Sequence, residues 1–374
     1  MQLLAIDLGK QKSLACWFNT LDQTHRLQTV PTSPQAFHDL LVQEPVDRVV
    51  IEVCDIAGWV ADLCRALSIP ILVANAAGEG WRWHNVKNKT DRTDVLKLSR
   101  LAAGNELTAV HVPIRPIRFW RGLILYRHRL IERRTRIKNA IHALLVAEGR
   151  AMPAGRETWS AASLAKLNAL AKPIEQCQTL EDLWAGHLHL ELQQLDHLQQ
   201  QIDLLDRKLD ALGSADHRVI RLQTIPGVGP RLSELVVAVL DDPQRFASVR
   251  QVSAYAGLVP RRYQSGQMDR QGRISRAGCG KLRKLLVEIA WGMLQHNARG
   301  REVFNRISKQ QRTRRKQAAV ALGRRVLGWC WAMLRDGSDW REPPREAASP
   351  HEAKPREARQ REARPPRRRT PALA

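Results

Sequence analysis

The chain has 374 residues, 44% of them hydrophobic, so it is long enough for two or more folded domains with ordinary cores. Sixty Lys and Arg residues against 37 Asp and Glu give a net charge of +23, far more than solubility requires, and this excess points to a nucleic-acid partner. Residues 341–374 hold ten Lys and Arg and five Glu, so they account for only +5 and leave +18 on the rest of the chain.

Cysteine usage and hydropathy exclude other classes. Six cysteines are scattered without C-x-x-C spacing, so neither a zinc site nor a disulfide framework is expected. The first residues lack a charged n-region followed by a long apolar h-region, so secretion is not expected, and no segment reaches the roughly 18 apolar residues that a membrane span needs. We expect a cytoplasmic protein without membrane contact.

The first hundred residues alternate between strand and helix patterns. Apolar runs at residues 3–7 and 13–18 predict a β-hairpin, and a helix is expected over 34–41. The run DRVVIEVC predicts a buried strand, residues 58–67 a helix, and PILVANA a further strand before the segment KTDRTDVLKLSRL. This alternation predicts an α/β sheet.

Four carboxylates in this region lie at predicted strand ends or at a predicted helix start. Asp7 and Glu52 end or nearly end apolar strands, and Asp91 and Asp94 lie three residues apart at the start of a helix, on one face of its first turn. Each has a plain structural explanation, such as a turn cap, a strand-end charge or the helix dipole. Together they predict one site for one or two Mg²⁺ ions, with Lys89 and Arg92 beside it to receive a polyanionic substrate.

The character of the chain changes at Arg115, where a long helix combines an apolar stripe with a dense Arg and Lys face. That face is either simply solvated or contacts phosphates. A connecting region at residues 151–173, for which no helix is predicted, precedes a second helix with leucine and isoleucine at heptad spacing. The seam either folds back on the first helix or is shared between subunits.

A glycine-containing turn precedes a helix in TIPGVGPRLSELVVAVL. Gly227 and Gly229 in such a turn let backbone N–H groups approach a phosphate closely, as in a helix-hairpin-helix element. The alternative is a connection that only requires positive φ.

Ser265 lies in a polar segment that we expect to be a loop. Five arginines surround it in sequence: Arg261, Arg262, Arg270, Arg273 and Arg276. Such cations bind a phosphodiester and lower the cost of forming a serine alkoxide, although most loop serines are only polar surface. Basic amphipathic helices over 301–331 follow, and the tail from Arg341, rich in Pro, Glu, Ala and Arg, is expected to be disordered.

These motifs resemble those of the DEDD transposases, the bridge-RNA-guided recombinases of bacterial insertion sequences. The matching segments are IDLGK with Asp7, IEVCDIAGW with Glu52, KTDRTD with Asp91 and Asp94, and, further along, PGVGP, AYAGLVPR, YQSG with Ser265 and LRKLLVE. The resemblance covers residues 3–336. Cys279 stands where many members carry Asn or Pro.

The resemblance implies a fold and a domain order. It implies an α/β RuvC-like (ribonuclease H-like) domain over residues 1–112 and a helical coiled-coil region over 113–213. A mainly helical transposase domain with a helix-hairpin-helix-like element and the catalytic serine follows over 214–338, and a basic tail over 339–374.

It also implies an activity and partners. The expected enzyme is a transposase that cuts and rejoins double-stranded donor and target DNA, using Mg²⁺ and a covalent phosphoester on Ser265. A structured noncoding guide RNA and a homo-oligomer, a dimer or tetramer, are expected as well. The implied localisation is the bacterial cytoplasm, with association to the nucleoid when the protein binds DNA. Two alternatives remain: a RuvC-like junction nuclease that uses metal-activated water, and a noncatalytic nucleic-acid-binding scaffold.

Overall fold

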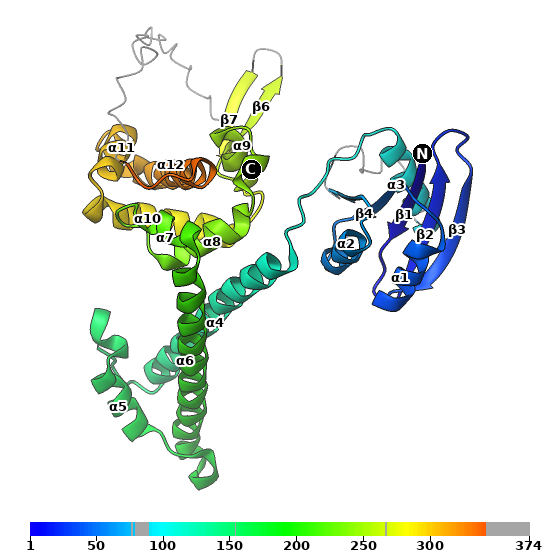
Figure 1. Cartoon of the computed structure of the whole chain (residues 1–374). Helices are drawn as coiled ribbons and strands as arrows, with labels where there is room; N and C mark the ends of the chain where they lie inside the picture. The colour runs from blue at the N-terminus through cyan, green and yellow to red at the C-terminus, as the bar shows by residue number, and fades with distance from the viewer. Residues whose placement is uncertain (76–77, 79–89, 154, 266–267, 342–374) are drawn as a thin grey trace, which may run out of the picture.

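The computed structural model describes residues 1–75, 78, 90–153, 155–265 and 268–341, arranged as an N-terminal sheet unit, a helical arm and a mainly helical C-terminal body (Figure 1). Lys89 and the tail beyond residue 341 lie outside the described residues, so the predictions made for them remain predictions. Within the described part of the chain, no helix is long and apolar enough to cross a membrane.

The N-terminal unit is a five-stranded mixed sheet in the order β3-β2-β1-β4-β5. Its strands are β1 (Gln2–Asp7), β2 (Lys12–Asn19), β3 (His25–Pro31), β4 (Arg48–Glu52) and β5 (Ile71–Ala74). Pairing is antiparallel across β1, β2 and β3, and parallel across β1, β4 and β5. The predicted hairpin and both later strands are confirmed, whereas the edge strand β3 was missed.

Helices cover both faces of this sheet: α1 (Pro34–Gln43), α2 (Ala57–Ala66) and α3 (Asp91–Ala103). Leu4 and Ile6 of β1 point to the side of α1 and α2, while Leu3 and Ala5 point to the side of α3. Successive strand residues alternate between faces, so two separate apolar layers form from one short strand.

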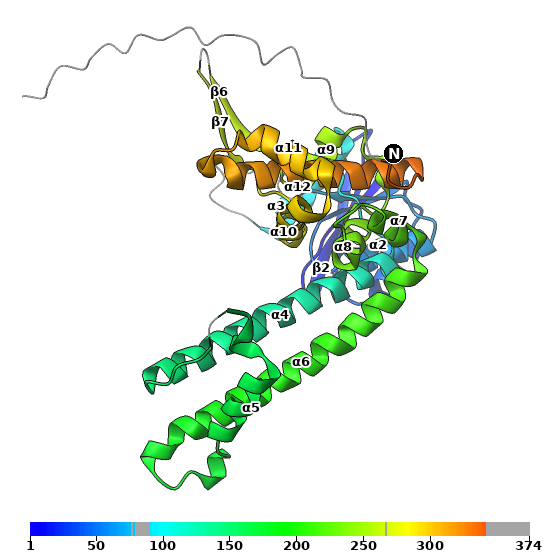
Figure 2. The same cartoon turned by 90° about the vertical axis from the view of Figure 1, so that its left-hand side faces the viewer.

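The helical arm pairs two 33-residue helices, α4 (Arg115–Ala147) and α6 (Leu183–Ala215), which run side by side away from the body (Figure 2). Leu188, Leu195, Leu198 and Ile202 of the heptad seam are buried against α4. The seam therefore folds back within the chain, which decides between the two alternatives. The connecting region at residues 151–173 contains a helix that was not predicted, α5 (Ala161–Leu170).

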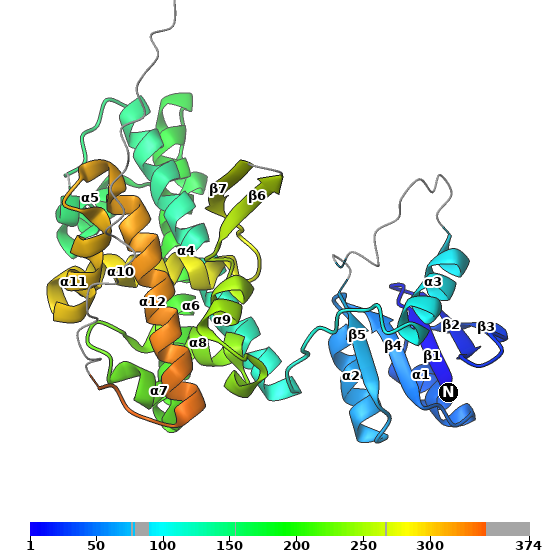
Figure 3. The same cartoon turned by 90° about the horizontal axis from the view of Figure 1, so that it is seen from above.

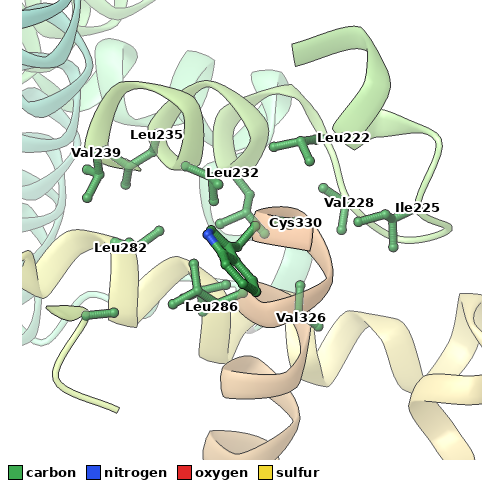
Figure 4. Packing of buried hydrophobic residues seen from close by; sticks show 14 of the residues in the cluster. Leu222, Ile225, Val228, Leu232, Leu235, Val239, Leu282, Leu286, Val326 and Cys330 are labelled. Carbon is green, nitrogen blue, oxygen red and sulfur yellow. The ribbon is translucent and has the colours of Figure 1, made fainter. Parts of the chain in front are cut away.

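Six helices and a hairpin form the C-terminal body. They are α7 (His217–Gln223), α8 (Pro230–Leu240), α9 (Val249–Tyr255), β6 (Pro260–Ser265), β7 (Met268–Ile274), α10 (Gly280–His296), α11 (Ala298–Ser308) and α12 (Arg315–Asp336). Helix α8 is its centre, because every residue from Leu232 to Leu240 is buried. Figure 4 shows Leu232 and Leu235 facing Leu282, Leu286 and Cys330 from α10 and α12.

A charged cluster joins the arm to the body. Glu234 of α8 is fully buried and lies 3.4 Å from Arg231, which also pairs with Asp210 of α6. A Cβ built at Gly213 of α6 would lie only 2.8 Å from Glu234 Oε1, so glycine lets the two helices approach closely. Burial raises the pKa of Glu234 to about 7, against the opposing effect of Arg231.

Glu234 should make stability depend on pH. Its raised pKa means that the folded protein binds a proton that the unfolded chain has lost, so stability falls as pH rises from about 4.5 to about 7. Glu234→Gln should remove up to about 3 kcal/mol of that fall. Denaturant unfolding of wild type and variant at several pH values measures it.

Glu288→Gln on α10 is the matched control, because the Glu288 side chain is 54% exposed. That variant should retain the wild-type dependence on pH. An unchanged slope in Glu234→Gln would contradict the account of the buried carboxyl.

Candidate active site

Two of the predicted carboxylates end adjacent parallel strands. Ile6 and Ile51 are register partners in β1 and β4, and Asp7 and Glu52 follow them directly. Asp7 continues the row of Leu3 and Ala5, and Glu52 that of Val50, which is the row facing α3. The structure therefore brings Asp7 and Glu52 to the same edge and the same face of the sheet, both half-buried.

The other two carboxylates begin α3. Asp91 is exposed, whereas Asp94 is only 8% exposed and lies on the helix face of Val95 and Leu98, which pack on the sheet. Thr90, not an aspartate, caps the helix: its hydroxyl accepts from Thr93 N at 3.2 Å in a reciprocal capping box. Capping therefore does not explain the buried Asp94.

A metal site of three or more protein ligands is not formed. Among the residues that the structure describes, no three His, Cys, Asp or Glu side chains lie close enough together to hold a metal ion. The donor chemistry nevertheless suits Mg²⁺, which binds carboxylate oxygens and commonly takes only one or two of them, with waters and substrate phosphates completing its shell. Asp7 and Glu52, with Asp94 on the covering helix, supply such oxygens.

One polar residue at this edge, Asn75, was not predicted from the sequence. Asn75 directly follows β5, whose Ala74 is the register partner of Glu52. Its backbone N–H donates to Thr108 O at 2.9 Å. Asn75 thus lies at the end of a third parallel strand, next to the strand that carries Glu52. The signal was the asparagine that follows the apolar run PILVA, the same pattern that revealed Glu52.

Ser265 was predicted to lie in a loop, and this prediction is wrong. Ser265 is the last residue of β6, its register partner is Met268, and β6 and β7 form an exposed two-stranded ribbon. The polar composition of both strands concealed this hairpin, because neither strand has a buried face. Figure 1 shows the hairpin projecting from the C-terminal body, separate from the five-stranded sheet.

Strand alternation divides the side chains of the hairpin between its faces. Ser265 and Met268 share one face with the register partners Tyr263 and Arg270. Tyr263, which the sequence analysis missed, is 54% exposed, and a Cβ at Gly272 would lie 3.3 Å from its ring. The serine therefore has an exposed aromatic ring and a cation on its own side.

Arg262 belongs to the other face and is already neutralised. Its Nε and Nη2 donate to the two carboxylate oxygens of Asp269 at 2.9 and 2.8 Å, which lowers the pKa of Asp269. Within the described residues, Arg270 has no hydrogen bond or ion pair of this kind. Between Arg262 and Arg270, it is therefore Arg270 whose charge is available to a phosphate beside Ser265.

The other predicted arginines lie near the base of the hairpin. Arg261 Nη2 donates to Ser275 O at 3.4 Å, and Arg273 is an exposed residue of β7. Arg276, at φ +59°, follows the hairpin and donates its backbone N–H to Gly257 O. Arg92 is a separate case, exposed in the first turn of α3.

The two glycines before α8 differ. Gly227 has φ +90°, so the conformational explanation applies to it. Gly229 has φ −97° and is the N-cap residue of α8, and a Cβ there would meet nothing within 4 Å. Open space in front of Gly229 suits close approach of a phosphate to the helix N-terminus.

Comparison with known proteins bears on this combination of features. Residues 220–305, which include α8, the Ser265 hairpin and α10, match the model described as "Transposase IS116/IS110/IS902 family". These residues are therefore similar to the IS116/IS110/IS902 family of transposases. Transposases catalyse DNA strand cleavage and transfer.

Relatives extend the likeness over most of the chain. A transposase for insertion sequence element IS1111A of Coxiella burnetii is 28% identical over 356 residues, covering 91% of this chain and 92% of that protein. A probable family 20 transposase of Pseudomonas aeruginosa is 28% identical and covers 79% and 86%. A putative transposase, y4pF/y4sB of Sinorhizobium fredii, is 32% identical over 60% of this chain, which spans only 57% of that relative.

The cap at the start of α3 can be tested separately from the carboxylates. Thr90→Ala should lower the free energy of unfolding by about 1 kcal/mol, because the first turn loses its side-chain acceptor. Thr135→Ala, in the exposed middle of α4, should cost nothing or stabilise slightly, since Ala favours helix interiors. Urea unfolding compares the two variants, and equal stabilities would contradict the capping role.

Proposed function

We propose that this transposase cuts and rejoins DNA through a Mg²⁺-dependent acidic site on its sheet and a serine nucleophile, Ser265, on its hairpin. The observation that carries the proposal is the exposed position of Ser265 at the end of a basic ribbon, on the same face as an available arginine. The family match over residues 220–305 includes this hairpin.

Asp7, Glu52, Asp91 and Asp94 would hold Mg²⁺, which when bound would neutralise charge on the scissile phosphodiester. The mixed sheet, with carboxylates at the ends of neighbouring parallel strands and a third on the covering helix, supports a RuvC-like domain over residues 1–112. Lys89, Arg92 and the turn with Gly227 and Gly229 would contact the nucleic-acid backbone.

Ser265 would act by nucleophilic displacement. Its Oγ bonds to phosphorus as the bond from phosphorus to one strand oxygen breaks; the serine proton goes to solvent and the departing oxygen takes a proton. The phosphoester retains the energy of the broken bond, so a hydroxyl at the end of another strand can attack it and release Ser265. Arg270 would stabilise the negative charge that develops on the phosphate oxygens.

The placement of the two chemistries suggests assembly of more than one subunit. The five-stranded sheet and the Ser265 hairpin lie on different units of the chain, which are joined through α4 (Figure 3). We infer that the working enzyme is a homo-oligomer, a dimer or tetramer, in which the acidic unit of one subunit serves the serine of another. Residues 113–213 would provide the helical spacer, 214–338 the serine domain, and 339–374 a basic tail.

Base pairing by a structured noncoding RNA would choose the donor and target sites, as the resemblance to bridge-RNA-guided recombinases implies. The charge of +18 outside the tail supports binding of more than one nucleic-acid strand. Double-stranded DNA is the substrate in this proposal and the RNA its guide.

The covalent step gives the first test. Incubated with labelled substrate DNA, guide RNA and Mg²⁺, wild type should yield a DNA-linked protein on a denaturing gel, and Ser265→Ala should yield none. Ser214→Ala, an exposed serine at the end of α6, is the control and should form the adduct normally. Equal cleavage by wild type and Ser265→Ala, without any adduct, would instead indicate hydrolysis by metal-activated water.

The sidedness of the hairpin gives a second test. Arg270→Gln should reduce adduct yield at least tenfold, because a cation beside a transferring phosphate contributes more than about 1.4 kcal/mol. The paired variant Arg262→Gln with Asp269→Asn removes both partners of the ion pair without changing net charge, so its yield should stay near wild type. Similar losses in both proteins would show that the two faces are not functionally distinct.

A further inference from the structure

The arginines of α4 that follow Arg115, which lies over the Phe119 ring, divide into two groups according to their contacts. Four are held inside the protein: Arg118 by Asp62, Arg121 by Ala238 O, Arg127 by Asp206 and Arg134 by Gln199. Three others, Arg129, Arg133 and Arg136, are exposed and make no hydrogen bond or ion pair with a side chain in the described ranges of the chain. The first group is thus bonded within the protein, whereas the second keeps its charge exposed; Arg129 also lies over the Tyr126 ring, 5.5 Å from its centroid.

The three exposed arginines form a row. They are spaced i, i+4 and i+7, so they share one face over two helical turns, where like charges destabilise an isolated helix. The row spans about 10 Å, and one strand of B-DNA carries a phosphate every 3.4 Å or so of its axis, so about three phosphates match it. A polyanion of regular spacing is the partner that relieves this repulsion.

A groove beside the row offers room for the backbone of such a polyanion. It has a volume of about 320 Å³, and Arg133 and Arg136 of α4 face Gln194 and His197 of α6 across it. These side chains present positive charge and hydrogen-bonding groups, and no carboxylate belongs to the groove lining. Ile137 and Leu198 complete the lining, and the charge of the two arginines makes the groove suit phosphate better than a cation.

The row continues toward the serine hairpin. Lys281, in the first turn of α10, donates to Glu132, which lies among the three arginines on α4. The hydrogen bond from Lys281, with added attraction from Lys284 and Arg136, lowers the pKa of Glu132, so three cations of this surface act on one carboxylate. Helix α10 is the next element after β7, so the same surface begins near the base of the hairpin, at the end opposite Ser265.

We propose that Arg129, Arg133 and Arg136 form a phosphate track along α4 that holds duplex DNA flanking the strand cut at Ser265. The inference rests on the proposed function, because the site of cleavage determines which DNA reaches the track. Duplex DNA leaving the hairpin meets α10 and then α4. The contact is with the backbone, so it should add affinity without sequence preference.

The test measures salt dependence of binding, by fluorescence anisotropy, for full-length protein and a 40-base-pair DNA duplex. Substituting Gln at Arg129, Arg133 and Arg136 together should reduce the slope of log affinity against log salt by about 2.7, which is 0.9 for each lost phosphate contact. A control triple variant, Lys166→Gln with Arg207→Gln and Lys208→Gln, removes the same charge from exposed residues of α5 and α6. Its slope should change by less than one contact.

Two outcomes would overturn the track: equal slopes in the two triple variants, or a loss confined to an RNA duplex of the same sequence. The Ser265 adduct, assayed in parallel, separates this inference from the proposed function. An adduct in wild type with no change in slope rejects the track alone. A reduced slope with no adduct from wild type rejects the serine mechanism and supports the track as a DNA-binding surface.

Discussion

The parallel pairing of β1 with β4 brings two carboxylates, Asp7 and Glu52, to one edge of the N-terminal sheet. Both belong to residue rows that face α3, so the same pairing determines which helix covers them. Apolar side chains on α3 then bury Asp94 on that side of the sheet. If this register slipped by one residue, Asp7 would still end its strand but would no longer end it beside Glu52.

The helical arm lies in sequence between the N-terminal sheet unit and most of the C-terminal body, and α4 connects the two units. Helices α4 and α6 pack against each other, and Arg127 and Arg134 of α4 bond to side chains of α6. Arg118 links α4 to the N-terminal unit through Asp62. A bond of 2.7 Å between His111 and Asp241 adds a second link between that unit and the body. With these links, the acidic edge and the serine hairpin lie on separate units, an arrangement that suits a reaction shared between subunits.

Much of the fold was readable from sequence wherever burial creates periodicity. The alternation of the first hundred residues predicted the sheet unit, and heptad leucines predicted α6. Strands β3, β6 and β7 escaped because they are largely exposed and their polar side chains give no apolar alternation. The choice between an internal and a shared seam also needed three dimensions, since Leu195 would be buried in either arrangement.

The site was predictable in part for the same reasons. A carboxylate that ends an apolar strand is conspicuous in sequence, as Asp7 and Glu52 were, and Asn75 carried the same signal. The difference between Arg262 and Arg270 had no signal, because it depends on which cation meets Asp269 across the hairpin. Likewise, the basic face of α4 offered two readings until its internally bonded arginines were separated from the exposed ones.

The most direct test of the central claim, that the acidic edge and Ser265 act on one phosphodiester, is the Mg²⁺ dependence of the covalent adduct in wild type and Asp94→Asn. The account predicts that wild type forms the adduct only with Mg²⁺, and that Asp94→Asn binds duplex DNA normally but forms almost none. Undiminished adduct in Asp94→Asn, or in wild type with the metal removed by chelation, would contradict it.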